Sequence, residues 1–210
     1  MIMKKHLFII FAGLLTVACQ PERQEADTSA TAPETKTTQA PAQSQGSTPD
    51  QLIRPGKGIG KISVNDRAET VFATLGQPDG GDAAMGKAWS IWYSKAPNST
   101  TDTTRYSTSV FTSRQMGVGD EANMVKQARV TSPFFRTEEG IQVGATLPQI
   151  SEQFPDMKQA PNQDLEERNS IIYDDVKRGI AFEINEEQVC TAITVHPPGE
   201  EVTAIYIGMP

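Results

Sequence analysis

Apolar and polar residues follow one pattern twice along the chain, in residues 55–135 and again in residues 136–210. A short apolar stretch at Ile62 is followed by apolar residues at i, i+3 and i+7, which is the spacing of one helix face. The same order begins again at Ile141. After each helix the apolar and polar residues alternate, which is typical of strands. The predicted strands are residues 88–94, 106–113 and a run through Val125 and Ala128 in the first copy, and residues 170–173, 180–184 and 189–195 in the second.

This pattern predicts an α+β fold, a tandem repeat of one helix followed by three antiparallel strands, with the helices packed on one face of the sheet. Two local signals support the helix starts. Asp66 and Glu69 match the spacing of a capping box, and so do Thr146 and Gln149. We therefore expect two α+β repeat units, residues 55–135 and 136–210.

The N-terminus has the layout of a secretory signal, residues 1–18. Lys4 and Lys5 precede an apolar run over residues 7–18, which is too short for the roughly 20 residues that a membrane-spanning helix needs. Residues 15–19 resemble the lipobox of bacterial lipoproteins, in which the cysteine, here Cys19, becomes the lipidated first residue. The alternative is an ordinary cleaved signal with a coincidental cysteine.

The lipobox resemblance implies a location as well as an anchor. Acyl chains such as palmitate on Cys19 would attach the protein to a membrane outside the cytoplasm. By resemblance to enterobacterial sorting, Gln20 after the cysteine favours the outer membrane over the inner. We therefore expect an outer-membrane lipoprotein of the bacterial cell envelope that faces the periplasm.

Residues 19–54 are predicted to be a lipidated, disordered tether. The segment is rich in Ala, Pro, Thr, Gln and Ser, and residues 20–51 contain no large apolar side chain. Such a segment buries too little apolar surface to offset the loss of chain entropy on folding. As a flexible coil it would have a mean reach of about 30 Å.

Charge narrows the classes of partner. The formal net charge is −7, and loss of residues 1–18, with two lysines and no acid, changes it to −9 (−7 − 2). Nucleic-acid binding needs clustered Lys and Arg, so this composition argues against nucleic acid. It also argues against direct binding to anionic lipid, which leaves the acyl anchor as the membrane attachment.

The first unit resembles a known family. Residues 62–64, a helix ending in Leu-Gly-x-Pro at residues 75–78, and a Trp-x-Tyr strand at residues 89–93 are similar to the SmpA/OmlA (BamE-like) outer-membrane lipoproteins. They also resemble the related fold of β-lactamase inhibitory protein, which has two such units in tandem. The resemblance implies a non-enzymatic role, in which the protein binds an envelope protein as an assembly accessory or an inhibitor.

The candidate binding residues are Trp92, Ser90 and Ser94. In a strand these three share one face, and residues 89, 91 and 93 share the other. If the helices cover the second face, Trp92 lies on an open face among small hydroxyl residues. Trp is common at binding hot spots, which makes Trp92 a candidate anchor. The alternative is that Trp92 packs in the core.

The sequence contains no recognisable catalytic motif, and we expect no metal and no cofactor. His196 is expected to be exposed or to cap a strand end, and Cys190 to be a small buried core residue rather than a reactive thiol. One alternative function is a small-ligand or lipid carrier with a pocket between the two units. An enzyme would instead require convergent charged groups. Residues 98–100 fit a glycosylation motif. The acidic stretch (Asp164, Glu166, Glu167, Asp174 and Asp175) could attract calcium, but it lacks the alternation and central glycine of a calcium loop, so a solvated face is preferred. An enzyme site would need a pair among Asp174, Asp175 and Glu183 to converge with Arg178.

Overall fold

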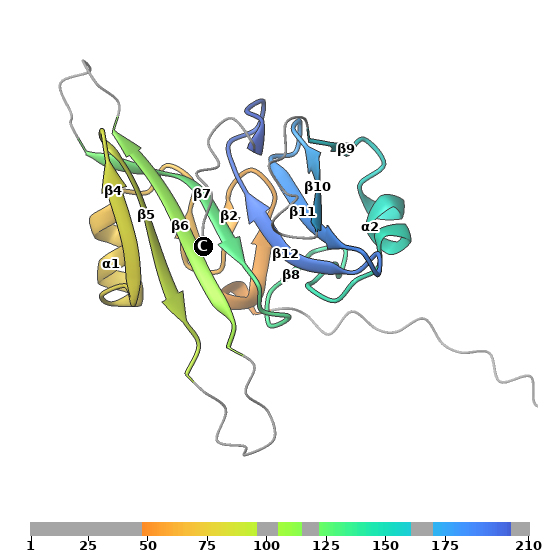
Figure 1. The fold of residues 1–210 in the computed structure, drawn as a ribbon, viewed down its shortest axis with the longest axis horizontal. Helices are drawn as coiled ribbons and strands as arrows, with labels where there is room; N and C mark the ends of the chain where they lie inside the picture. Colours follow the sequence, from red (N-terminus) through yellow and green to blue (C-terminus); the bar gives the residue numbers. More distant parts are fainter. Residues whose placement is uncertain (1–47, 96–104, 115–121, 161–169, 203–210) are drawn as a thin grey trace, which may run out of the picture. The chain divides into compact units, whose positions relative to one another are not determined.

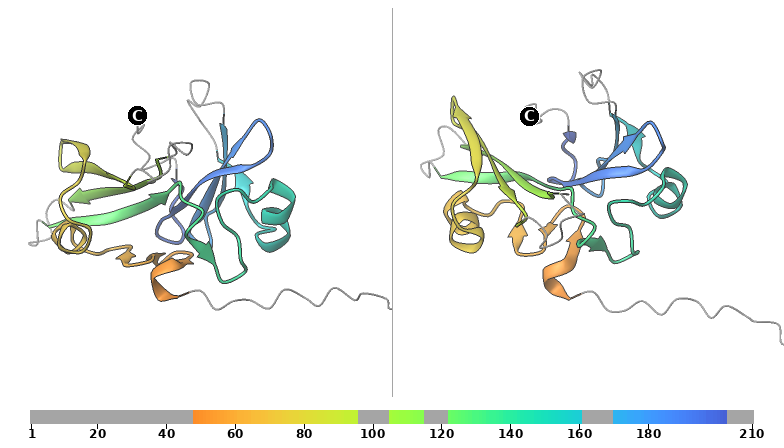
Figure 2. Two further views of the ribbon diagram at one scale, coloured as in Figure 1. Left: turned by 90° about the horizontal axis from the view of Figure 1, so that it is seen from below. Right: turned by 60° about the horizontal axis from the view of Figure 1, so that its bottom comes forward.

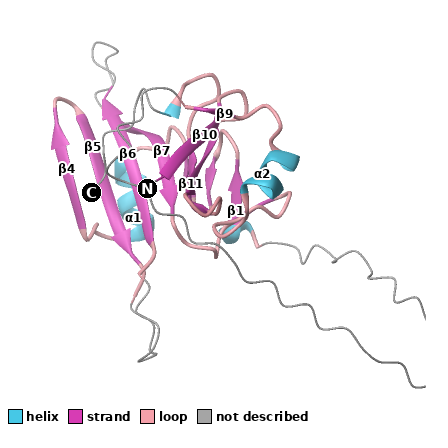
Figure 3. Ribbon diagram, turned by 45° about the vertical axis from the view of Figure 1, so that its right-hand side comes forward, coloured by secondary structure: helices cyan, strands magenta, loops and turns pink. Residues whose placement is uncertain are grey.

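Strands make up most of the regular structure in the computed structural model, which describes residues 48–95, 105–114, 122–160 and 170–202 (Figures 1 and 3). These residues all belong to one unit, residues 42–210. The helical elements are η1 (Pro49–Gln51), α1 (Ala68–Leu75) and α2 (Leu147–Gln153). The strands are β1 (Leu52–Arg54), β2 (Gly58–Ile59), β3 (Ile62–Ser63), β4 (Gly80–Ala84), β5 (Lys87–Tyr93), β6 (Ser107–Arg114), β7 (Asn123–Val130), β8 (Arg136–Thr137), β9 (Lys158–Gln159), β10 (Ser170–Asp175), β11 (Ile180–Asn185) and β12 (Cys190–Val195).

The strands form two sheets. The larger has eight strands in the order β4-β5-β6-β7-β12-β11-β10-β9, with antiparallel neighbours throughout. The strands that follow α1 make one half of this sheet and the strands that follow α2 make the other. The halves meet where β7 pairs with β12. The smaller sheet has the order β3-β2-β1-β8, with β1 and β8 parallel.

The predicted α+β tandem of one helix and three strands is wrong. The described residues are mostly β, and α1 and α2 are each followed by four described strands that join a single sheet. Within the large sheet, the strands missed by sequence are the two outermost, β4 and β9. Gly80–Ala84 contains no β-branched or aromatic residue, and Lys158 and Gln159 are exposed, so neither has the side chains that favour strands. Both form because the neighbouring strand offers a complete row of backbone partners.

The small sheet was not predicted from the sequence either. β1 belongs to the segment that was expected to be the end of the tether, yet Ile53 at its centre has no exposed surface. β1 pairs with β2 and with β8, so the chain from residue 49 onward is part of the fold. Figure 2 shows β1 and β2, in orange, and α1, in yellow, on the same side of β6 and β7.

The main core lies between the large sheet and the elements on that side. Pairing across the strands places one row of residues on this face, because directly paired residues point the same way. In this row Trp92 on β5 meets the ring of Phe72 in α1, with 6.0 Å between ring centroids. Phe182 on β11 meets Phe154, which directly follows α2, at 4.9 Å. The row consists of Trp92, Thr108, Val130, Ile193, Phe182 and Tyr173.

The two helix starts differ from each other. At α2 the Thr146 N–H donates to the Gln149 side chain at 2.9 Å, which is the reach-back bond of the predicted capping box. At α1 the N-terminal residue before the helix is Arg67, so the predicted box from Asp66 is wrong. The Asp66 carboxylate instead accepts the Ser63 N–H at 2.9 Å and closes the turn that leads into the helix.

Candidate functional site

Trp92 lies in the core rather than on an open face. Its side chain is 9% exposed, and its indole N–H donates to the Gly76 carbonyl at the end of α1, with 3.1 Å between Nε1 and O. Ser90 shares this face and is half-buried. Ser94 lies beyond the end of β5, where its hydroxyl accepts the Tyr106 N–H at 3.0 Å. The structure therefore does not bring Trp92, Ser90 and Ser94 together as a binding surface.

The opposite face of β5 carries the accessible aromatic residues. Tyr93 is 42% exposed, and the Arg105 guanidinium lies 4.8 Å from the centre of its ring. Trp89, on the same strand and face, is half-buried, and Ile91 between them is buried. Sequence alternation correctly separated the two faces of β5. It did not show which face the helix covers, because both faces carry a tryptophan.

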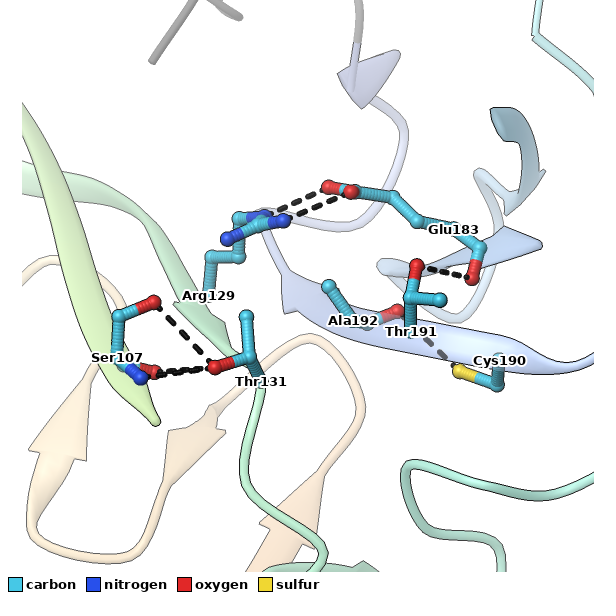
Figure 4. A network of polar contacts seen from close by, with 7 residues as sticks. All are labelled: Ser107, Arg129, Thr131, Glu183, Cys190, Thr191 and Ala192. Atoms are coloured by element: carbon cyan, nitrogen blue, oxygen red, sulfur yellow. Dashed lines mark hydrogen bonds and ion pairs between the residues drawn. The ribbon is translucent and has the colours of Figure 1, made fainter. Parts of the chain in front are cut away.

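At the centre of this same face, an ion pair bridges the two halves of the sheet (Figure 4). The Arg129 guanidinium on β7 donates two hydrogen bonds to the Glu183 carboxylate on β11, at 2.6 and 2.8 Å, across the intervening β12. The two side chains are only 15% and 8% exposed. A two-bond pair of this kind fixes the orientation of both groups and is among the stronger polar contacts in proteins.

A second buried polar group surrounds Asp174 on the same face. The His196 ring nitrogen Nε2 lies 2.9 Å from Asp174 Oδ1, and Nδ1 lies 3.1 Å from the Pro197 carbonyl oxygen. Asp174 Oδ2 accepts the Val202 N–H at 2.9 Å. The Gln127 side chain donates to the Val202 carbonyl, also at 2.9 Å. This network ties the chain after β12 to the sheet.

His196 has no exposed surface, so of the two roles predicted for it, exposure and capping of a strand end, exposure is wrong. Sequence reasoning missed its partner because Asp174 precedes it by 22 positions and no motif joins the two. Both ring nitrogens already face an oxygen acceptor, so the imidazole has no position left for a metal or a substrate. Across residues 48–95, 105–114, 122–160 and 170–202, no group of three or more His, Cys, Asp or Glu could hold a metal ion.

The charged groups considered for an enzyme do not converge. Glu183 pairs with Arg129 and Asp174 with His196. Arg178 pairs with Glu139, donates to the Gln153 carbonyl at 3.1 Å and lies over the Phe154 ring. Asp175 accepts only the backbone N–H of Arg178 among the hydrogen bonds found for its carboxylate in the described residues.

Glu139 has a perturbed pKa. Its partial burial raises the pKa, but hydrogen bonds and the positive charge of Arg178 more than offset this, and the pKa lies below its ordinary value. A carboxylate held by one arginine at a partly exposed position is typical of a structural ion pair. The Glu139–Arg178 pair fastens the loop before α2 to the turn after β10.

Cys190 is a buried core residue, as predicted. It is 1% exposed, and its thiol donates to the Ala192 carbonyl at 3.3 Å (Figure 4). Burial, together with the nearby Glu183 carboxylate, raises the pKa of this thiol to about 12. The thiolate is therefore almost absent at neutral pH, and nucleophilic chemistry needs the thiolate.

A groove of about 530 Å³ lies beside α2. Its walls come from residues 139–145 and from Gln149, Glu152 and Gln153, so it belongs to the second half of the chain rather than to a junction between halves. Glycine and polar side chains supply most of the lining. A lipid carrier needs an apolar cavity, and this groove is not one.

Several sequence-based candidates lie outside the described residues. These are the signal and lipidation site at Cys19, the glycosylation motif at residues 98–100, and Asp164, Glu166 and Glu167 of the acidic stretch. Within the described part of the chain, no helix is long and apolar enough to cross a membrane.

Comparison with known proteins gives weak likenesses only. No family model matches the chain, and no curated protein matches it. One similar solved structure is a DUF4309 family protein (YjgB) from Bacillus subtilis, with 15% identity and a TM-score of 0.40 over 68% of this chain and 88% of that one. Another is the uncharacterized protein yfeY from Escherichia coli, with 9% identity and a TM-score of 0.34 over 70% and 99%.

The resemblance to SmpA/OmlA (BamE-like) lipoproteins and β-lactamase inhibitory protein is therefore wrong. No family model matches the chain, and one eight-stranded sheet takes the place of the tandem units of one helix and three strands that the resemblance implied. The motif that suggested it is a helix ending in Leu-Gly-x-Pro followed by an aromatic strand. This motif has a local structural cause, the termination of the helix. Gly76 ends α1 with φ of 84°, a conformation that glycine adopts without strain, and Trp92 then covers the helix end. Unrelated folds can share such a feature.

Proposed function

We propose that the mature protein is a lipid-anchored envelope protein of the outer membrane, facing the periplasm, that binds another envelope protein through the sheet face opposite its helices. The signal-like N-terminus and Cys19 support the anchor, and residues 19–48 supply the length of a tether. The net charge of −9 after loss of residues 1–18 (−7 − 2) favours a protein partner over nucleic acid.

One observation carries the binding proposal. Tyr93 leaves 42% of its surface exposed on this face, and Arg105 lies over its ring. Trp89 lies on the same face of β5, at the second alternate position before Tyr93. Tyr, Trp and Arg are the residues most enriched at the energetic centres of protein interfaces.

The neighbouring positions fit the same role. Ser107 on β6 pairs with Tyr93, and Gly80 on β4 pairs with Ile91, so small residues neighbour the Tyr93 ring on this face, whereas Trp89 pairs with Phe111 and Asp82. A large ring among small neighbours offers a partner a protruding apolar contact, and the buried Arg129–Glu183 pair joins the two halves of the sheet on the same face. The partner is expected to present an apolar pocket with an acidic or carbonyl oxygen for Arg105.

The test is in-cell crosslinking followed by capture of the tagged, full-length lipoprotein from detergent-solubilised membranes. Tyr93→Ala should reduce recovery of a specific envelope protein at least tenfold, which corresponds to a loss of about 1.4 kcal/mol in binding. The matched control is Phe134→Ala, which removes another exposed aromatic side chain, 51% exposed, from a loop outside this face.

Recovery should be unchanged in the control. Equal loss in both variants would point to non-specific apolar adsorption. Equal recovery of the same partner with wild type and Tyr93→Ala would refute binding through this face.

A further inference from the structure

Two side chains, rather than a neighbouring strand, hold Val202 against the sheet. Its N–H donates to Asp174 on β10, and its carbonyl accepts from Gln127 on β7, both at 2.9 Å. Asp174 and Gln127 come from different halves of the large sheet. Both bonds use only main-chain atoms of Val202, so they would form with any residue other than proline at this position.

The Val202 side chain occupies an apolar site of its own. It is 1% exposed and packs with Ala160, Ile172 and Ala181 in a cluster that is separate from the main core. Asp174 is fixed at its other oxygen by buried His196, so the acceptor for the peptide N–H is already oriented.

The connection to Val202 is short and largely exposed. The chain reverses at Gly199, which has φ of 84° and donates its N–H to the Val176 carbonyl at 2.8 Å. Glu200 and Glu201 are exposed. Val202 can therefore leave its site by rotations at these two residues, while β12 and the turn at Gly199 stay in place.

The same face holds two buried polar atoms without a hydrogen-bond partner among the described residues. Ser109 Oγ and Gln127 Oε1 are buried, on side chains that are each 1% exposed, and no hydrogen-bond partner for either atom exists in the described part of the chain. Register places both side chains on the face that holds Val202, because Ser109 pairs with Arg129 and Gln127 with Phe111. A buried polar atom without a partner destabilises the folded protein, and a donor group of a bound peptide would remove that penalty.

We propose that this face contains a binding site for an apolar peptide segment, and that the chain's own residue Val202 occupies it until a partner's segment displaces it. The occupied site is thus an autoinhibitory contact. The eight residues after Val202, Thr-Ala-Ile-Tyr-Ile-Gly-Met-Pro, contain no charge and belong to the same class of ligand. Only the identity of the competitor rests on the proposed function, since occupation by Val202 is independent of any partner.

The test uses the full chain with Val202→Asp, in which a carboxylate cannot enter an apolar site beside Asp174. The probe is a fluorescein-labelled peptide of residues 199–210, followed by fluorescence anisotropy. The peptide should bind Val202→Asp saturably and wild type at least tenfold more weakly. A competing peptide that itself carries Val202→Asp should be at least tenfold weaker than the unsubstituted one, whereas a control peptide with Glu200→Gln, a change at an exposed position, should compete normally. No saturable binding to folded Val202→Asp would overturn the proposal.

If Val202→Asp does not fold, hydrogen exchange of the wild-type chain tests whether Val202 leaves its site. The Val202 amide should exchange through a local opening, at least a hundredfold faster than amides at the centre of β12. Gln127→Leu should increase the rate at Val202 further and leave β12 unchanged. Exchange of the Val202 amide only on global unfolding would show that this residue is a permanent part of the core and would overturn the proposal.

Partner capture separates this inference from the proposed function. If Val202 is autoinhibitory, Val202→Asp should increase recovery of the envelope partner that Tyr93→Ala loses. Peptide binding without any captured partner would refute the proposed function and leave the site standing. Equal capture by wild type and Val202→Asp, with no peptide binding, would refute autoinhibition alone.

Discussion

Removing the Trp92 side chain should destabilise the protein strongly, because this residue closes the core at the end of α1. Trp92 is 9% exposed, contacts Phe72 and donates to the Gly76 carbonyl. Replacing a buried Trp by Ala costs about 3–5 kcal/mol. In a protein of this size, each kcal/mol lowers the melting temperature by about 2–4 °C, so Trp92→Ala should lower it by about 6–20 °C.

Trp92→Phe separates the hydrogen bond from the packing. Phenylalanine keeps a ring against Phe72 but loses the indole N–H, so the bond to Gly76 is lost. The expected cost is about 1–2 kcal/mol, the net value of a hydrogen bond with a partly buried acceptor left behind. Tyr93→Ala, at the adjacent exposed position, should cost under about 1 kcal/mol and serves as the control.

The assay is urea unfolding of the chain without residues 1–19, monitored by circular dichroism and by tryptophan fluorescence. The sequence has two tryptophans, so Trp89 remains as the only fluorescent tryptophan in both Trp92 variants. Equal slopes of free energy against urea would show that the unfolded states are comparable. A loss below about 1 kcal/mol for Trp92→Ala would refute the placement of this side chain in the core.

Two polar contacts give further predictions. The first is a double-mutant cycle with Arg129→Met and Glu183→Leu, measured by urea unfolding. The double variant should be more stable than the sum of the two single losses predicts, with a coupling free energy of about 1–3 kcal/mol. A coupling near zero would show that the ion pair does not stabilise the contact between the two halves of the sheet. Glu139→Gln should cost under about 1 kcal/mol at pH 7, since its bond to Arg178 is partly exposed. The pKa of Glu139 is lower in the folded state than its ordinary value of 4.5, so its stabilisation is complete above that value and is lost as pH falls through the folded pKa. The stability difference between wild type and Glu139→Gln should therefore vanish in acid, and a difference that grew as pH fell would contradict this sign.

The alternation of apolar and polar residues located the strands, but it did not show which face of a strand the helix covers. Alternation over residues 88–94 located β5 to within one residue, because period-two alternation depends only on neighbouring side chains. The choice of covered face depends on α1, whose Phe72 meets Trp92 and not Trp89. The two faces of β5 carry similar apolar residues, so sequence alone could not show that α1 covers the face of Trp92.

Long-range contacts account for the other failures. β4 forms although its residues disfavour strands, because β5 provides its backbone partners. His196 is buried because Asp174, distant in sequence, lies on the adjacent part of the same face. The contact of Val202 could not be predicted either, because its carbonyl accepts a hydrogen bond from Gln127, which lies 75 positions earlier. No spacing rule within one segment reveals such pairs.

The junction of β7 with β12 has a consequence for how the protein folds. Its register pairs are only Ala128 with Val195, Arg129 with Thr194 and Val130 with Ile193. The hairpins on either side join residues close in sequence, whereas these pairs close a loop of more than 60 residues, at a greater cost in chain entropy. The two hairpin groups should therefore assemble first and separately, and their edge-to-edge docking should limit the folding rate. In the interval, β7 and β12 each present an unpaired edge, and a second copy of the chain could pair there in place of the correct half.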